Sequence, residues 1–342
     1  MLQLDTIRYM GNKSKLLEYI IPEIKKVTPE NGIVCDLMAG SNVVSYALKE
    51  FFTVYTNDIQ EYSYIISDAV IVNQTERINS TKAVLDLQKH IHENETKKNF
   101  DFFEKTYSKT YFSLKQCCYI DSIRYAISKV DNKHKQSLYL LALMNSMCVV
   151  QSTPGHFAQF MPSDHKRIIP LQKMDLWKEF LKQCDKYSDI FFSNSENKAF
   201  CKDYKELFQT ESLINVDTIY LDSPYSQEQY SRFYHILETV VKYDNPVVNY
   251  KAKYRENRFM SDFCYKSKVE QEFVKILSFC KTNNINLVIS YSNKAVLPIN
   301  KLEDLCKAFF SFVNRQDISY SHSTQGKGNQ ILSEVIFTCS NW

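Results

Sequence analysis

Apolar positions in the first part of the chain switch between a helical period and a strand-like one. Residues 14–27 repeat apolar side chains three and four positions apart, which predicts an amphipathic helix. An apolar run at 33–35 predicts a strand, a helix-like stretch follows at 43–51, and a second strand is expected at 53–58. Because a β-turn-α-β order of this kind is the building block of a parallel sheet, the sequence predicts an α/β fold.

Further strand-like runs extend this predicted sheet. They lie at 218–221, 284–293 and 332–340, with a short one at the start of 199–207. Ligands of open α/β sheets sit at the carboxyl ends of the strands. We therefore expect one binding edge that carries the acids following separate strands, which are Asp36, Asp58, Asp203 and Asp222.

The middle of the chain has a different pattern. From 74 to 198 the strand signals fade, 119–130 has isoleucines on one helical face, and 137–150 is apolar all round, as in a buried helix. This segment holds 19 Lys and Arg against 14 Asp and Glu. We expect 74–198 to be a basic, mostly helical domain inserted into a sheet domain made of 1–73 and 199–342.

Composition narrows the class of protein further. The net charge of +3 over 342 residues excludes a globally basic nucleic-acid binder, so any such contact must come from a local patch. The ten cysteines form no CxxC pair and the histidines show no ligand spacing, so no metal site is expected. We interpret the cysteines as reduced thiols of a cytoplasmic protein. No signal peptide and no apolar run long enough for a membrane span is found.

Two turns after predicted strands are candidate ligand loops. "DLMAGSN", residues 36–42, either brings backbone close to a ligand or simply makes a tight strand-helix turn in which Asp36 is a cap. Asp58 lies 18 positions beyond Gly40, a spacing at which dinucleotide folds bind ribose hydroxyls. Earlier in the chain, "RYMGNK" places Lys13 either against a ligand carboxylate or at a helix start.

The stretch "DSPY", residues 222–225, carries the most specific chemistry. Asp222 and the carbonyl of Ser223 can each accept a hydrogen bond from an exocyclic amine, Pro224 restricts the backbone, and Tyr225 offers a stacking face. An ordinary β-turn is the alternative. The aromatic stripe that follows at 227–243 is more typical of core than of a nucleic-acid platform, and the loops at 152–160 and 320–330 either contact DNA or are solvated.

Taken in order, these motifs resemble those of the Dam-like, alpha-group adenine-N6 DNA methyltransferases of the restriction-modification type. The resemblance covers roughly 1–73 and 199–342, and the middle corresponds to that family's target-recognition domain. It implies a Rossmann-like fold that uses S-adenosylmethionine. It also implies a cofactor pocket with Tyr9 and Lys13 at the methionine end, Asp58 at the ribose and Asp203 near the adenine, together with Asp36, Met38, Ala39, Gly40, Ile59 and Asp222.

The same resemblance assigns Asp222, Ser223, Pro224 and Tyr225 to the catalytic tetrad. Two positions depart from the family pattern. Asn42 stands where a second glycine is usual, and asparagine tolerates the left-handed region, so we expect the turn to survive. Ser223 stands where the first proline of the tetrad is usual, which leaves open how well the site works.

The function that follows is methyl transfer to the exocyclic amine of an adenine flipped out of double-stranded DNA. A separately encoded restriction endonuclease is a possible partner, and a monomer is favoured. The alternatives are methylation of cytosine N4 or RNA, and a DNA-binding protein with a decayed methylase site. Glutamine-methylating protein methyltransferases use a similar tetrad, but the basic middle segment argues against them.

Overall fold

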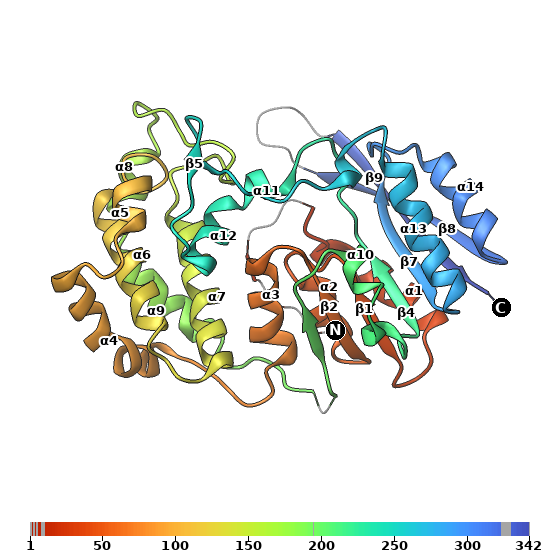
Figure 1. The fold of residues 1–342 in the computed structure, drawn as a ribbon, viewed down its shortest axis with the longest axis horizontal. Coiled ribbons are helices and arrows are strands. Elements are labelled where there is room, and N and C mark those ends of the chain that lie inside the picture. Colours follow the sequence, from red (N-terminus) through yellow and green to blue (C-terminus); the bar gives the residue numbers. More distant parts are fainter. Residues whose placement is uncertain are drawn as a thin grey trace.

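The computed structural model describes residues 2, 4, 6–7, 11–193, 195–322 and 330–341, and within them it forms a seven-stranded sheet (Figure 1). The strand order is β3-β2-β1-β4-β7-β9-β8. All pairs from β3 to β7 are parallel, and β9 runs antiparallel to both β7 and β8. The strands are β1 (Ile33–Asp36), β2 (Thr53–Asn57), β3 (Lys198–Phe200), β4 (Thr218–Leu221), β7 (Asn286–Ser292), β8 (Phe312–His322) and β9 (Gln330–Ser340).

This sheet confirms the predicted α/β fold and the predicted strands. Its centre, β4, is buried at all four residues, as expected for an apolar strand covered on both faces. The edge strand β8 was not predicted, because its polar residues do not follow the alternation of a half-buried strand. The prediction for the loop at 320–330 falls mostly on 323–329, outside the described residues.

Helices cover both faces of the sheet and form two hydrophobic cores. One face packs against α10, α13 and α14, and its core contains Ile219, Leu287 and Phe337. The other face packs against α1 and α2, and its core contains Tyr220, Val288 and Ile336. The flanking helices are α1 (Leu17–Val27), α2 (Val43–Leu48), α3 (Glu61–Ser67), α10 (Tyr204–Leu207), α13 (Val269–Thr282) and α14 (Ile299–Phe309), with short turns at Ser14–Leu16, Asp68–Val72, Glu211–Leu213 and Asp262–Cys264.

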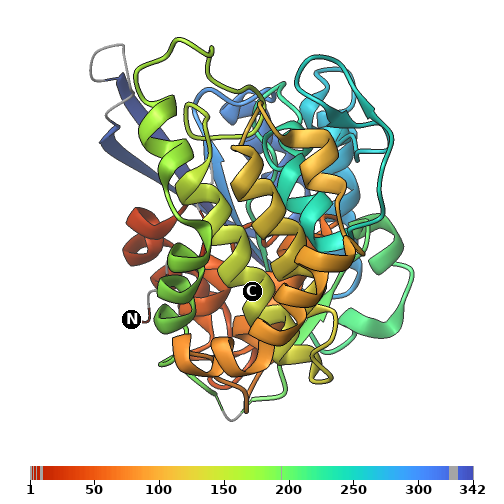
Figure 2. The ribbon, with the colours of Figure 1, turned by 90° about the vertical axis from the view of Figure 1, so that its left-hand side faces the viewer.

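The middle segment forms a layer of helices beside the sheet, at the left of Figure 1 and facing the viewer in Figure 2. As predicted from its all-round apolar sequence, α7 is buried over nearly its whole length from Ser137 to Val150. The core of this layer is continuous with the core on the α1 face of the sheet. Its helices are α4 (Ser80–Lys97), α5 (Phe102–Tyr107), α6 (Leu114–Ile127), α7 (Lys133–Val150), α8 (Ile168–Lys173) and α9 (Leu176–Lys186).

A second stretch of chain completes the same layer. The segments α11 (Tyr230–Phe233), α12 (His235–Lys242) and the hairpin β5 (Val248–Asn249) and β6 (Tyr254–Arg255) follow β4 in sequence, yet they pack on the middle helices. Phe233, Tyr234 and Leu237 are buried there, so the aromatic stripe at 227–243 is core, as its spacing suggested. The loop at 152–160 is also fixed here, because the Phe157 N–H donates to the Phe233 carbonyl at 3.0 Å.

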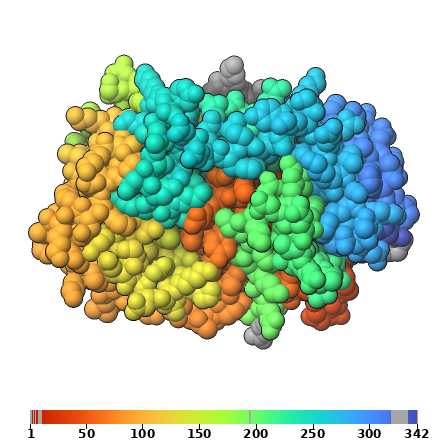
Figure 3. All heavy atoms as spheres, in the orientation of Figure 1, coloured from red at the N-terminus to blue at the C-terminus, as the bar shows by residue number. Residues whose placement is uncertain are grey.

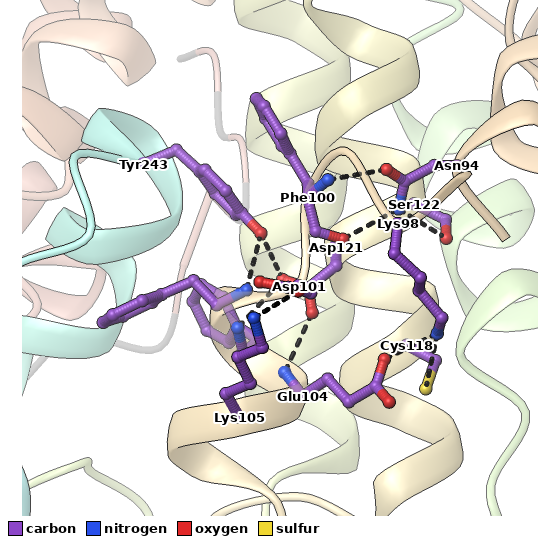
Figure 4. Close-up of polar contacts among 12 residues, drawn as sticks. Asn94, Lys98, Phe100, Asp101, Glu104, Lys105, Cys118, Asp121, Ser122 and Tyr243 are labelled. Carbon is purple, nitrogen blue, oxygen red and sulfur yellow. Dashed lines mark hydrogen bonds and ion pairs between the residues drawn. The ribbon is translucent and has the colours of Figure 1, made fainter. Parts of the chain in front are cut away.

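Asp121 on α6 is the centre of the contact between these two stretches (Figure 4). Its carboxylate accepts the backbone N–H groups of Phe103 at 2.9 Å and Glu104 at 2.8 Å, so it caps the start of α5. It also accepts the hydroxyl of Tyr243, whose ring stacks on Phe100 with centroids 4.0 Å apart. We call Asp121, Tyr243 and Phe100 the Asp121 junction; it joins the end of α12 to α5 and α6.

Candidate active site

The carboxyl ends of β1, β2 and β4 open into a cleft of about 1130 Å³, part of it open to solvent. In the space-filling view the surface is hollowed between α10 and α12, over α3 (Figure 3). Apart from Tyr9, which lies outside the described residues, every residue predicted for the site lines this cleft. They are Lys13, Asp36, Met38, Ala39, Gly40, Asp58, Ile59, Asp203, Asp222, Ser223, Pro224 and Tyr225.

The turn between β1 and α2 adopts the left-handed backbone that its sequence requires. Gly40 has φ +50° and Asn42 has φ +60°, so the expectation that asparagine replaces the second glycine without loss of the turn is confirmed. The Asn42 side chain has a further role, because it donates to the Ser63 carbonyl at 3.1 Å and accepts from the Ser67 hydroxyl at 2.7 Å. It therefore fixes the turn to α3, which a glycine could not do.

Asp58 organises the same turn. Its carboxylate accepts the backbone N–H groups of Gly40 at 2.9 Å and of Gln60 at 2.8 Å. Burial raises the pKa of Asp58 to about 6, although these two hydrogen bonds act in the opposite direction. Since a carboxylate offers about four acceptor sites, it can still accept ligand hydroxyls. The sequence indicated the spacing of Asp58 from Gly40 but not the hydrogen bond between them.

Asp36, only 2% exposed, lies at the base of the cleft. One carboxylate oxygen accepts the hydroxyl of Ser45 in α2 at 2.5 Å, and the other has no hydrogen-bond partner among the described residues. Burial raises the pKa of Asp36 to about 7, and the nearby acids Asp222 and Asp58 add to the effect. A buried carboxylate with a free acceptor in a cleft fits a ligand that carries positive charge.

Lys13 and Asp222 form an ion pair at the start of "DSPY", in which Lys13 is buried and the Asp222 side chain is 23% exposed. Their charged atoms lie 2.9 Å apart, Lys13 is 4% exposed, and its ammonium lies 5.5 Å from the ring centre of Tyr225. Burial acts to lower the pKa of Lys13, yet the carboxylates of Asp222 and Glu334 raise it overall. The sequence suggested a ligand carboxylate or a helix start for Lys13; the structure places it at the start of the turn Ser14–Leu16 and pairs its ammonium with Asp222.

The N-terminal segment lies directly against this tetrad. Gly11 has φ +76°, and a Cβ atom at that position would lie 2.9 Å from the hydroxyl of Tyr225, so only glycine fits. Ser223 is 2% exposed, and its hydroxyl has no partner among the described residues. Asp203 accepts the Lys205 N–H at 2.9 Å and thereby caps α10 at the other end of the cleft.

Sequence reasoning missed several residues of this region. Tyr204 donates to Glu272 at 2.6 Å, and both line the cleft near Asp203. Glu334, in β9, is buried near Lys13 and Asp222. An acid inside the apolar run "LSEVIFTCS" was a signal that could have identified Glu334. In the described parts of the chain, no group of three or more His, Cys, Asp or Glu side chains could hold a metal ion, and no helix is long and apolar enough to cross a membrane.

A mostly parallel seven-stranded sheet of this order, with its cleft at the strand ends, is consistent with the methyltransferase fold. The family model "D12 class N6 adenine-specific DNA methyltransferase" matches residues 9–305, and the chain belongs to this family.

Curated relatives agree with this assignment. The chain is 27% identical to the modification methylase LlaI of Lactococcus lactis subsp. lactis, over 98% of this chain and 55% of that protein. It is 28% identical to the modification methylase StsI of Streptococcus sanguinis, over 97% and 51%. With the type II methyltransferase M2.HphI of Haemophilus parahaemolyticus it shares 25% identity over 98% and 97%. The chain thus spans about half the length of the first two relatives and nearly all of the third.

Proposed function

We propose that this protein is a site-specific DNA methyltransferase that transfers a methyl group from S-adenosylmethionine to N6 of an adenine in double-stranded DNA. Family membership supports the reaction class. The observation that carries the proposal is the arrangement of Asp222, Tyr225 and Lys13 in one cleft with Asp36 and Asp58. An amine acceptor and an aromatic face beside acids suited to a cationic cofactor support this reaction.

The residues of the cleft fit S-adenosylmethionine. The free oxygen of Asp36 suits its positive charge, and the remaining acceptor sites of Asp58 suit its ribose hydroxyls. We assign the adenine end of the cofactor to Ile59 and Asp203, and the methionine end to Lys13 with Tyr9. Met38, Ala39 and Gly40 contribute the turn that the cofactor contacts. When bound, the cofactor supplies a methyl group on a sulfonium, which is already a strong methyl donor.

The tetrad would bind the target base. The reacting nitrogen of adenine lies inside the base stack, so the base must be flipped out to reach the cleft. Tyr225 would stack on the flipped ring, while Asp222 and the carbonyl of Ser223 accept the two amine hydrogens. These hydrogen bonds direct the nitrogen lone pair toward the methyl group, so the protein supplies orientation and electrostatics.

The serine at 223 is compatible with this mechanism. The mechanism uses the backbone carbonyl of that residue, which serine provides as well as proline does. The hydroxyl of Ser223 makes no hydrogen bond within the described ranges, so it holds none of the neighbouring side chains in place. We therefore favour an active enzyme over a decayed, DNA-binding one. Methylation of cytosine N4 or of RNA would use the same acceptors, and family membership favours adenine.

We assign residues 74–198 to DNA target recognition and residues 1–73 and 199–342 to catalysis. The middle segment holds 19 basic and 14 acidic residues, and this surplus of positive charge supports contact with DNA phosphates. Because this segment shares a core with the α1 face of the sheet, deleting it would expose apolar surface of the catalytic part. Point substitutions are therefore the better test. We also propose that the protein acts in the cytoplasm as a monomer, beside a separately encoded nuclease.

For the recognition segment, the test replaces Lys166 and Arg167, exposed residues just before α8, by glutamine. We expect weaker DNA binding and a shallower salt dependence, with about one unit of the salt slope lost per phosphate contact. Lys82→Gln with Lys89→Gln on α4, at the lower left of Figure 1, is the matched control and should leave the slope unchanged. Equal effects of both pairs would contradict a phosphate contact by Lys166 and Arg167.

For the reaction, the purified protein is incubated with S-adenosylmethionine and with DNA or RNA, and the nucleosides are analysed by mass spectrometry. We expect N6-methyladenine in DNA, at sites that sequencing of host DNA with modification detection would locate. The inactive control is the double variant Asp222→Ala, Lys13→Met, which removes both charges of the buried pair. N4-methylcytosine, methylated RNA, or DNA binding without methylation would each overturn the proposal in a different way.

A further inference from the structure

The sheet face beneath Lys13 carries a row of buried polar side chains. Tyr220 pairs with Val288 in the register of β4 and β7, and Glu334 pairs with Ser292 in the register of β7 and β9. Since alternate residues of a strand share a face, Tyr220, Ser290, Ser292 and Glu334 lie on the face that packs against α1. All four are buried in what would otherwise be an apolar layer.

Among the described residues, the Oε2 atom of Glu334 has no hydrogen-bond partner, and the Tyr220 hydroxyl meets only that of Ser290. Buried polar groups without partners destabilise a fold, and in native proteins they call for an explanation such as a catalytic task. The position of these side chains supplies such an explanation, because Lys13 and Asp222 of the candidate active site lie next to this row.

Glu334 interacts electrostatically with the ion pair of the tetrad. Burial raises the pKa of Glu334 to about 7, the Lys13 ammonium acts against this shift, and the Asp222 carboxylate adds to it. The other titratable groups that face it are the hydroxyls of Tyr220 and Tyr225. Its neighbour on β8 is the apolar Ile318. Glu334 is therefore a second carboxylate that acts on Lys13 without replacing Asp222.

We propose that Glu334 is a positioning residue of the methylation site, whose carboxylate makes the Lys13–Asp222–Glu334 group net negative beside the target amine. The inference rests on the proposed function. With Glu334 ionised the three side chains sum to one negative charge, and with Glu334 neutral they sum to zero. The sign of this charge matters because of where positive charge moves during the reaction.

During methyl transfer the amine lone pair forms the new N–C bond, and the electrons of the breaking S–C bond stay on sulfur. Positive charge therefore moves from sulfur to nitrogen, and the nitrogen then releases a proton to Asp222 and on to water. A net negative group fixed beside the nitrogen stabilises this movement, and the effect is large in a site with little water. The isolated Lys13–Asp222 pair has no net charge and would stabilise it less.

The test compares single-turnover methylation by the wild type and Glu334→Gln, at saturating cofactor and DNA, between about pH 5.5 and about pH 8.5. Protonated glutamate and glutamine are both neutral, so we expect nearly equal rates at the acid end. As Glu334 ionises, the wild type should become faster, by about tenfold at the alkaline end. Glu334→Asp retains the charge and should retain most of this advantage.

Glu23→Gln is the matched control. Glu23, on α1, is also a buried carboxylate against β9, where it accepts the hydroxyl of Thr338 at 2.6 Å. The variant makes the same chemical change beside Thr338, which lies four positions beyond Glu334 along β9 and away from the tetrad. The ratio of its methylation rate to that of the wild type should therefore not vary with pH. If the rate ratio for Glu334→Gln is likewise constant across pH, Glu334 is only structural and the inference is wrong.

A second measurement does not depend on methylation. The carboxyl resonance of Glu334 in carbon-13-labelled protein is assigned by its loss in Glu334→Gln and followed through a pH titration. We expect a midpoint well above the ordinary glutamate range, and a further rise in Lys13→Met. An ordinary midpoint that Lys13→Met does not change would overturn the inference. A wild type that methylates nothing, with the expected titration, would instead count against the proposed function alone.

Discussion

Asp36→Asn should stabilise the empty protein at alkaline pH while weakening its cofactor binding. Burial raises the folded-state pKa of Asp36 from its ordinary value of 3.8 to about 7. Between these values the folded protein retains a proton that the unfolded chain has released. The contribution of Asp36 to stability therefore falls as pH rises through that window, and the whole cost is present above it.

The size of the effect follows from the width of that window. One pKa unit corresponds to about 1.4 kcal/mol. Between about pH 5 and about pH 8 the wild type crosses roughly two units of the window. Its free energy of unfolding should therefore fall by about 2–3 kcal/mol through Asp36, and that of the asparagine variant should not. Asparagine has the same shape and still offers an oxygen to the Ser45 hydroxyl. Any constant structural effect of the substitution cancels when the two pH values are compared.

The assay is urea unfolding of both proteins at the two pH values, each with and without S-adenosylmethionine. Without cofactor, the variant should gain about 2–3 kcal/mol relative to the wild type on going from acid to alkaline pH. With cofactor this gain should shrink by about 1.4 kcal/mol or more, because the variant has lost the carboxylate that faces the positive charge and its affinity should fall at least about tenfold. An identical stability difference at both pH values would show that Asp36 carries no buried charge, and the reasoning would fail.

Three further outcomes are expected at the same cleft. Asp222→Ala should abolish methylation and also cost up to about 3 kcal/mol of stability, because the buried Lys13 cation loses its nearest carboxylate and keeps only its interaction with Glu334; adding Lys13→Met should restore the stability but not the activity, as unfolding and methylation assays would show. Asp58→Ala should weaken S-adenosylmethionine binding about 10- to 100-fold, through the loss of hydrogen bonds to the ribose hydroxyls and of the bonds that hold Gly40 and Gln60, and unchanged affinity by calorimetry would remove Asp58 from the site. Ser223→Ala should change single-turnover methylation little, and Ser223→Pro should leave it similar or modestly higher; an inactive alanine variant would mean that the hydroxyl takes part.

The strand ends were the most predictable part of this protein. A buried parallel strand needs a continuous apolar run, and the residue that ends the run is visible in sequence, which is how Asp36, Asp58, Asp203 and Asp222 were placed on one edge. The expected strand at 284–293 is observed as Asn286–Ser292. The left-handed Asn42 was predictable for a similar reason, because few residues other than glycine tolerate that backbone.

Contacts between distant segments could not be predicted in this way. The Lys13–Asp222 pair joins residues more than half the chain apart, and the sequence around either residue does not indicate that it contacts the other. Glu334 faces them only because β9 takes its place between β7 and β8, a sheet order that periodicity does not reveal. The role of Asp58 in holding the Gly40 N–H depends on the distance between two loops, which the spacing of 18 positions does not determine.

The Asp121 junction has a consequence for exchanging specificity between relatives. The buried carboxylate of Asp121, from the middle segment, accepts the hydroxyl of the half-buried Tyr243, from the chain after β4, whose ring stacks on Phe100. The guanidinium of Arg124 adds to this, since it donates to the Val240 carbonyl at 2.8 Å and the Val241 carbonyl at 2.9 Å. A chimera that grafts 74–198 alone would leave these partners mismatched. A transplant that carries 235–255 along with it keeps the joint intact, so we expect the exchangeable module of this protein to be two pieces of sequence rather than one.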